Sequence, residues 1–245
     1  MSEQPSFKPV KREPVYVKVA RAIEAEIVSG RFGHGDILPT ETVLAEQFEV
    51  TRSSVREGLR VLEQSGLIGR GAAKRLIVAR PDADSVAEAA SRSLALSGAT
   101  FGDVWEALAI FYPQAARLAA VKFSADDLDA LKLAHERFCA QNSEDRAAIV
   151  TEAAGFLHIL AERLDNQVVL ALLDALNRMI AASLALVIDQ TPHATTRIKT
   201  AQMELITAIA ARQEDDAERW MSKHIDDLKR GFSVAGQSLQ ARITL

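Results

Sequence analysis

The 245-residue chain has a single cysteine, Cys139, so an intrachain disulfide is excluded. One thiol is usual for a reducing compartment, and the polar N-terminus lacks the apolar core of a secretory signal. A long uncharged run is missing too, because the most apolar stretch, residues 168–188, is interrupted by Asp174, Asn177 and Arg178. We therefore expect a cytoplasmic protein without a membrane span.

Signatures of common enzymes are also missing. The sequence shows no serine nucleophile elbow, phosphate-binding loop or zinc-binding helix motif. His135 and Cys139 are four residues apart and would share a helix face, but a Cys-His pair needs an activating environment to become a nucleophile. The sequence predicts a protein that is not an enzyme and that needs no cofactor.

Charge is distributed unevenly along the chain. Residues 1–80 carry 13 Lys/Arg and 10 Asp/Glu, net +3, whereas residues 81–245 carry 16 and 23, net −7. A basic head on an acidic body is typical of a DNA-binding module joined to a domain that does not touch DNA. We expect a flexible arm over residues 1–13, a DNA-binding domain over residues 14–80 and a second domain over residues 81–245.

Residues 38–68 show the pattern of a helix-turn-helix. Pro39 stops the preceding segment and the hydroxyl of Thr40 can cap a helix, while Thr51 can cap a second one after a tight connection. Apolar residues at helical spacing in the second helix should face the core. These are Val55, Leu59 and Leu62. A helix before this unit is indicated by Val19, Ile23 and Ile27.

The outer face of the second helix carries basic and hydroxyl side chains and no acid: Arg52, Ser53, Arg56 and Arg60. Such a helix N-terminus suits a major groove, because its free N–H groups attract phosphate and arginine reads guanine. We expect the second helix to end over residues 66–68. Residues 69–78 then predict a small hairpin, with residues 70–74 as the turn and residues 76–78 as a strand. An ordinary amphipathic helix pair with a solvated basic face is the alternative.

Residues 85 onward read as almost entirely helical, because strand-like alternation is absent and proline occurs only at Pro113 and Pro192. Pro113 lies within a helical pattern and should kink it. Short breaks suggest antiparallel neighbours and an all-α bundle. The predicted helices span residues 85–97, 101–121, 125–140, 145–164, 167–189, 193–212 and 214–234. The predicted fold class is mainly α, with an N-terminal winged helix-turn-helix.

Residues 15–78 resemble the gluconate-repressor (GntR) family of bacterial winged-helix regulators. The match rests on the motifs Gly-Asp-Ile-Leu-Pro-Thr-Glu (35–41), Leu-Ala-Glu (44–46), Val-Thr-Arg-Ser-Ser-Val-Arg-Glu (50–57) and Leu-Glu-Gln-Ser-Gly-Leu-Ile (62–68). The resemblance implies that helix residues contact DNA, namely Thr51, Arg52, Ser53, Ser54 and Arg56. We add Thr42, where the family often has Arg, and the basic wing residues Arg70, Lys74 and Arg75.

The second half resembles the all-helical effector domain (FCD-like) of the branch of the fatty-acid-responsive regulator. Many relatives in this branch hold a metal through one Asp and three His, and the metal holds a carboxylate effector. Alignment on flanking residues places Ala153, Leu157 and Gln202 at three of these positions, and His224 at the fourth. One imidazole and one amide make a poor metal site, so we expect no metal there.

The resemblance also implies an effector site in the bundle, and the residues aligned there exchange charge for apolar and aromatic surface. We expect its lining to be Trp105, Leu108, Tyr112, Leu157, Gln202 and His224. Such residues suit an apolar or aromatic small metabolite, although Leu and Trp at helical spacing also fit a plain core. A metal-bound carboxylate effector is the other alternative.

Together these features predict a ligand-responsive transcription regulator, more often a repressor than an activator. We expect a homodimer on a pseudo-palindromic double-stranded DNA operator, with the bundle or helix 101–121 in the two-fold interface. A metabolic enzyme or sensor domain tethered by a basic head is the alternative from another class.

Overall fold

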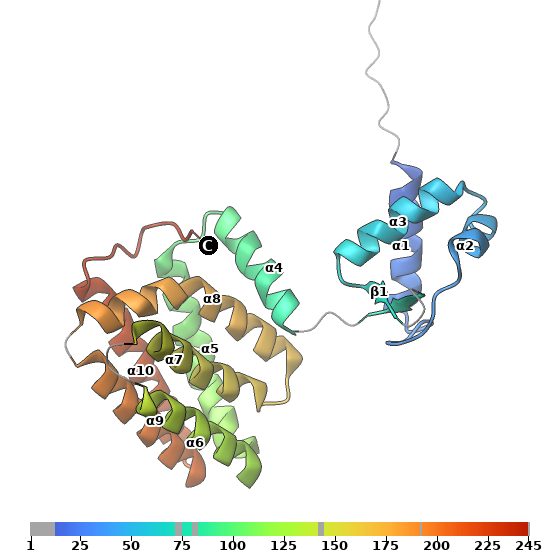
Figure 1. Ribbon diagram of the computed structural model, residues 1–245. Coiled ribbons are helices and arrows are strands. Elements are labelled where there is room, and N and C mark those ends of the chain that lie inside the picture. Colours follow the sequence, from blue (N-terminus) through green and yellow to red (C-terminus); the bar gives the residue numbers. More distant parts are fainter. Residues whose placement is uncertain (1–12, 72–74, 80–82, 142–144, 192, 245) are drawn as a thin grey trace, which may run out of the picture. The chain divides into compact units, whose positions relative to one another are not determined.

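A computed structural model of the chain describes residues 13–71, 75–79, 83–141, 145–191 and 193–244. The chain divides into two compact units, Met1–Asp82 and Ala83–Leu245. Figure 1 shows helices and a small hairpin in the first unit, and a set of helices in the second. Each unit is considered by itself.

The first unit contains three helices and a two-stranded antiparallel sheet. The helices are α1 (Val15–Val28), α2 (Glu41–Gln47) and α3 (Arg52–Gln64), and the strands are β1 (Ile68–Arg70) and β2 (Leu76–Val78). The segment before α2 adds a second row of hydrogen bonds to this hairpin, on the free edge of β2, since Leu38 N donates to Leu76 O and Val78 N donates to Asp36 O, both at 2.9 Å. This order of elements is a winged helix-turn-helix.

Both predicted helix caps are confirmed in this unit. Thr40 Oγ1 accepts from Val43 N at 3.4 Å, and Thr51 Oγ1 accepts from Ser54 N at 3.3 Å. The predicted core positions are confirmed as well, because each is at most 4% exposed. They are Val19, Ile23, Val55, Leu59 and Leu62.

The hairpin differs from the prediction at its start. The helix ends at Gln64 rather than over residues 66–68, and Ile68 is already the first residue of β1. Arg70 is a strand residue paired with Leu76, not the beginning of the turn. The physical reason is that Gly66, at φ 75°, turns the chain away from the helix, so that buried Ile68 can pair with buried Val78 across the core.

The second unit is all-helical, as predicted. Its helices are α4 (Ala83–Leu96), α5 (Phe101–Lys122), α6 (Ala125–Ala140), α7 (Arg146–Glu162), α8 (Gln167–Gln190), α9 (Ala194–Ala210) and α10 (Glu214–Val234). Ser124 caps α6 and forms a reciprocal capping box with Asp127. Pro113 lies inside α5, which continues through it as one helix. Among the described residues, no single helix is long and apolar enough to cross a membrane, although the two bent parts of α8 pass that test as a pair.

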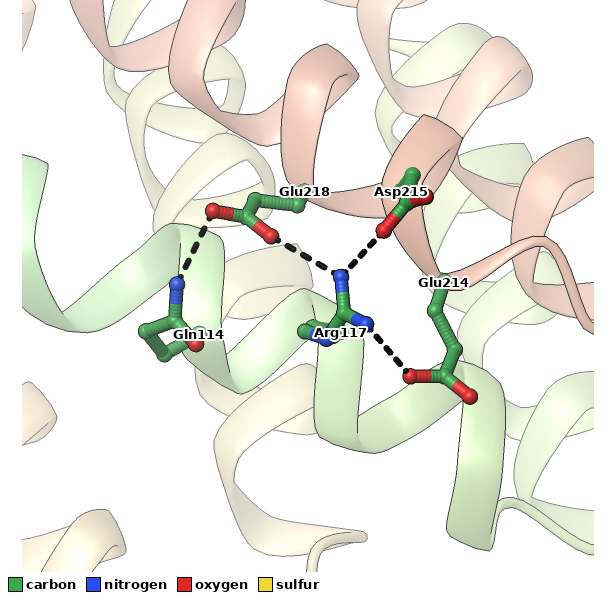
Figure 2. A network of polar contacts seen from close by, with 5 residues as sticks. All are labelled: Gln114, Arg117, Glu214, Asp215 and Glu218. Carbon is green, nitrogen blue, oxygen red and sulfur yellow. Dashed lines mark hydrogen bonds and ion pairs between the residues drawn. The ribbon is translucent and has the colours of Figure 1, made fainter.

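Helix α5 lies at the centre of this unit, in contact with α7, α8, α9 and α10. Polar contacts fix its C-terminal half against the first turn of α10 (Figure 2). Arg117 pairs with Glu214 at 3.0 Å, with Glu218 at 3.2 Å and with Asp215, while Gln114 Nε2 donates to Glu218 Oε1 at 3.0 Å. Carboxylates at the N-terminus of α10 are also favoured by the positive end of its helix dipole.

The end of α5 is closed by an arginine from the turn between α9 and α10. Arg212 Nη1 donates to the backbone oxygens of Ala120 and Val121 at 3.0 and 3.1 Å, and Nη2 donates to that of Phe123 at 2.6 Å. The last carbonyls of a helix have no partner within it. Arg212 therefore satisfies three acceptors near this helix terminus and joins the ends of α5 and α9.

Two glycines within helices should respond oppositely to alanine. A Cβ at Gly58 of α3 would lie 2.9 Å from Tyr16 O and 3.2 Å from Val19 Cγ1, whereas a Cβ at Gly155 of α7 would meet only Glu152 Oε2, at 4.0 Å. We expect Gly155→Ala to raise the free energy of unfolding by about 0.5–1 kcal/mol through helix propensity. Gly58→Ala should lower it by about 1–3 kcal/mol because α1 and α3 must separate. Urea unfolding of the full chain measures both, and a stable Gly58→Ala variant would contradict the close packing of α1 on α3.

Candidate nucleic-acid interface and helical-unit interior

Helix α3 has one buried and one exposed face. Val55, Leu59 and Leu62 are buried, whereas Arg52, Ser53, Arg56 and Arg60 are exposed and Ser54 is half-buried. The N-terminal turn is held by Thr51, whose Oγ1 also lies 3.0 Å from Ser54 Oγ. Within the described part of the chain, no hydrogen bond or ion pair holds the side chains of Arg52 and Ser53. The structure thus brings the predicted helix residues together on one accessible surface.

Arg56 is not free on this surface. Its Nε lies 3.2 Å and its Nη2 3.0 Å from Glu41 Oε2, at the first residue of α2. The hydrogen bond with Glu41, followed by the charge of that carboxylate, raises the pKa of Arg56. The outer stripe of α3 itself carries no acid, but the folded helix pair places one beside it. The acid comes from the neighbouring helix, and it sets the direction in which Arg56 points.

The wing brings further basic side chains beside the start of α2. Arg70 pairs with Glu63 at 3.0 Å, and Arg75 is exposed. Both line a hollow of about 640 Å³ that also includes Thr40 and Glu41. Thr42 lies half-buried in the first turn of α2. Lys74, predicted at the wing tip, is outside the described residues.

The four positions aligned with the family's metal ligands do not offer a metal site. Ala153 and Leu157 are buried in α7, and Gln202 Oε1 lies 2.9 Å from His135 Nδ1. Of these four residues only His224 is of a kind that commonly binds metal ions. A single imidazole does not offset the hydration that a divalent cation loses on binding. Over the described residues, no group of three or more His, Cys, Asp or Glu is placed to hold a metal ion. The donor set does not fit the family's metal.

The six predicted effector residues are all buried in the helical unit. Trp105, Leu108, Tyr112 and Leu157 belong to its main core, at 0–3% exposure. The Tyr112 hydroxyl donates to Asn177 Oδ1 at 2.7 Å, and burial raises the pKa of Tyr112. His224 borders a cavity of about 10 Å³, roughly one water molecule. The side chains themselves occupy the space in which a ligand was expected.

Three buried side-chain N–H donors of the helical unit have no acceptor among the described residues, and two of them belong to predicted effector residues: Trp105 Nε1 and Gln202 Nε2. Buried donors of this kind are normally paired, because an unpaired one costs about 1–3 kcal/mol. Cys139 Sγ lies 3.4 Å from His135 Nε2, at the edge of the same region.

Sequence reasoning missed a polar contact between α7 and α8. His158 Nδ1 lies 2.9 Å from both carboxylate oxygens of Asp174, whose side chain is only 10% exposed. The hydrogen bond with Asp174 raises the pKa of His158 against the opposing effect of burial. His224 shows the reverse, since burial lowers its pKa to about 4. The 16-residue separation of His158 and Asp174 gave no local signal for this pair.

A winged helix-turn-helix with a basic exposed helix face, followed by an all-helical unit, is the architecture typical of a DNA-binding transcription regulator with a separate regulatory domain. Residues 15–77 match the family model described as bacterial regulatory proteins, gntR family, and residues 103–227 match the FCD domain model. The chain belongs to the GntR family of bacterial transcription regulators, in the branch that carries an FCD domain. The family consists of regulators, so the alternative of a metabolic enzyme is set aside.

Curated relatives and a solved structure agree with this membership. The chain is 28% identical over 235 residues to the HTH-type transcriptional repressor NanR of Escherichia coli (strain K12), covering 94% of this chain and 89% of that protein. It is 27% identical over 237 residues to NanR of Salmonella newport (strain SL254), covering 95% and 91%. A solved structure, Streptococcus agalactiae GntR, has the same fold, with a TM-score of 0.65 at 21% identity over 88% of this chain and 99% of that one.

The two histidines should give opposite pH dependences of stability. The pKa of His158 is higher in the folded state than its value of about 6.5 in the unfolded state. Its protonation therefore stabilises the folded state fully at pH values below about 6.5, and this contribution is lost as pH rises through the folded-state pKa. A lowered pKa means that His224 costs stability as pH falls from about 6.5 towards about 4. His158→Gln should therefore lose more stability at about pH 6 than at about pH 8.5, and His224→Leu should be less sensitive to acid than the parent. Urea unfolding over a pH series tests both, and equal losses at all pH values would contradict these assignments.

Proposed function

We propose that the protein represses transcription as a homodimer, with α3 of each subunit in the major groove of a pseudo-palindromic operator. The observation that carries this proposal is the exposed N-terminal half of α3, where Arg52 and Ser53 are free and Arg56 is oriented by Glu41. Arginine forks held in one direction favour bidentate contact with guanine. Similarity to repressors named NanR supports the repressor role, and action on a bacterial chromosome implies the cytoplasm.

The other predicted DNA-binding residues would support this contact without reading bases. Thr51 and Ser54 build the cap that leaves the first N–H groups of α3 available for a phosphate. Thr42 lies in the first turn of α2, and Arg70 and Arg75 of the wing add positive charge beside it. Lys74, which lies outside the described residues, is assigned the same part from its position in the sequence. Contacts of this second group would go to the DNA backbone and would set position rather than sequence.

The homodimer is supported by an apolar face on α5. Ile110, Phe111, Leu118 and Val121 are large, and each is between 41% and 64% exposed. They recur at helical spacing around Gln114, so they form one stripe. We assign this stripe to the two-fold interface, where the same face of a second copy would cover it.

The effector proposal concerns the interior residues Trp105, Leu108, Tyr112, Leu157, Gln202 and His224. A ligand there must displace core side chains, because the space is filled. Its apolar body would replace leucine and aromatic contacts, and an acceptor such as a carbonyl would meet Trp105 Nε1 or Gln202 Nε2. The alternative, a carboxylate held by a metal, is disfavoured by Ala153 and Leu157, which offer no ligand atom.

The DNA proposal predicts base-reading roles for two arginines. Arg52→Ala and Arg56→Ala should each weaken binding to a duplex selected from a random pool by roughly 1–3 kcal/mol and relax its sequence preference. Arg21→Ala is a matched control, because it removes one exposed arginine from α1 in the same unit. Fluorescence anisotropy at fixed salt measures the affinities. Unchanged binding in both α3 variants would exclude α3 from the groove.

Glu41 should act on specificity through Arg56. Glu41→Gln removes a negative charge facing DNA, so affinity for random duplexes should rise. It also frees the Arg56 guanidinium, so the ratio of selected to random affinity should fall. A variant with lower affinity for random DNA and an unchanged ratio would contradict the positioning role of Glu41.

The dimer proposal predicts that charge within the α5 stripe separates the subunits. Ile110→Glu and Leu118→Glu should sediment as monomers at micromolar concentration, because a buried unpaired carboxylate is costly. Leu133→Glu on α6 makes the same change at a residue that is 52% exposed, outside the stripe, and should leave the dimer intact. A parent that is a monomer, or stripe variants that stay dimeric, would refute this interface.

The effector proposal predicts that divalent metal ions do not change the thermal stability of the protein. Zinc, nickel or manganese should not raise the thermal unfolding temperature, and chelation should not lower it, because His224 stands alone. Apolar or aromatic carbonyl compounds should raise that temperature in the parent more than in Gln202→Leu. Stoichiometric metal by elemental analysis that is lost in His224→Ala would favour the metal-bound alternative.

A further inference from the structure

A second hollow of the helical unit lies away from the interior residues discussed above. It has a volume of about 260 Å³ and lies between α4, α7 and α8. Its floor is made by small residues, Ala154, Gly155 and Ala181, so that the backbone of two helices is not covered by long side chains. A Cβ at Gly155 would have nothing closer than Glu152 Oε2 at 4.0 Å. The space therefore exists without any displacement of the core.

The polar wall of this hollow consists of two ion pairs. His158 of α7 pairs with Asp174 of α8, and Arg178 of α8 pairs with Asp84 in the first turn of α4. Each carboxylate is thus already balanced by a cation. The wall as a whole is neutral when His158 is protonated, so its net charge favours neither a cationic nor an anionic ligand, and hydrogen-bond geometry decides between them.

What this wall still offers is hydrogen-bond donors. The side-chain oxygen of Asn177 accepts from the Tyr112 hydroxyl at 2.7 Å. The Nδ2 of the same amide is buried and has no acceptor among the described residues. The second ring nitrogen of His158 is not engaged by Asp174, and the Arg178 guanidinium has five N–H groups, of which the pair with Asp84 uses only part. An amide, an imidazole and a guanidinium around a small hollow require a ligand rich in acceptors.

We propose that this hollow between α4, α7 and α8 binds a short-chain aliphatic carboxylate without metal. The carboxylate would accept from Asn177 Nδ2 and from the fork of Arg178, which suits a planar pair of oxygens. The aliphatic chain would lie on Ala154, Gly155 and Ala181.

This site has a direct route to the DNA-binding unit along the chain. Asp84 is the second residue of α4, and Ala83 is the first residue after that unit. A ligand that draws Arg178 towards its own carboxylate competes with Asp84 for the same guanidinium. Occupancy is therefore linked to the start of α4, independently of the interior effector site.

The test uses the full-length protein without DNA, so its outcome does not depend on the proposed operator binding. Straight-chain carboxylates from acetate to hexanoate are titrated, and ¹H–¹⁵N TROSY spectra report the affected amides. We expect shifts confined to the residues around this hollow, strongest for chains of intermediate length. Gly155→Leu, which fills the floor, and Asn177→Asp, which keeps the acceptor for Tyr112 but loses the amide donor, should each weaken binding at least about tenfold. Leu133→Ala on α6, at an exposed position outside the hollow, is the control and should bind as the parent does.

Three results would overturn the proposal. The first is an absence of shifts with every carboxylate in the series. The second is binding that persists unchanged in both Gly155→Leu and Asn177→Asp, which would place the ligand elsewhere. The third is equal affinity for butyramide and butyrate, which would show that charge plays no part. If Gly155→Leu fails to fold, Asn177→Asp decides the location by itself.

Discussion

The helical unit depends on how closely α5 approaches its neighbours. Ala115, Ala116, Ala119 and Ala120 are buried at 0–3% exposure, so the helix meets other backbones through methyl groups. Close backbones leave little free volume, which is why the interior is filled by side chains rather than hollowed. The same closeness brings the last carbonyls of α5 within reach of Arg212. Open space appears instead where α7 and α8 carry small residues at the surface.

Ion pairs, rather than net charge, determine how the arginine side chains of the DNA-binding unit are held. Glu41 and Glu63 each hold an arginine of the basic surface, Arg56 and Arg70 respectively. Exposed ion pairs of this kind are worth little to stability, and salt screens them. Their effect is on direction, because a guanidinium that is already oriented loses less conformational entropy when it binds. A phosphate or base must compete with the carboxylate for it.

Most of the fold follows from local signals in the sequence. Thr40, Thr51 and Ser124 cap helices because their hydroxyls can reach the free N–H groups, and such residues also mark the breaks between long helices. The register of the wing could not be predicted, since strands of three residues are too short to show alternation. Contacts between separate helices, such as those of Arg56 with Glu41 and His158 with Asp174, have no sequence spacing that announces them. Whether side chains fill the interior depends on their volumes summed over several helices. The residues aligned with the family's effector site do not give that sum, so the filled interior could not be predicted.

The row of hydrogen bonds between β2 and the segment before α2 has a mechanical consequence. Leu38 is bonded to the strand, and only Pro39 and Thr40 separate it from Glu41, the partner of Arg56. Because Pro39 fixes one backbone angle and Thr40 is the helix cap, this path is short and stiff. A displacement of the wing would thus move the carboxylate that orients the Arg56 side chain on α3. In the proposed DNA complex, strain where the wing meets the duplex would rotate that guanidinium in the neighbouring groove.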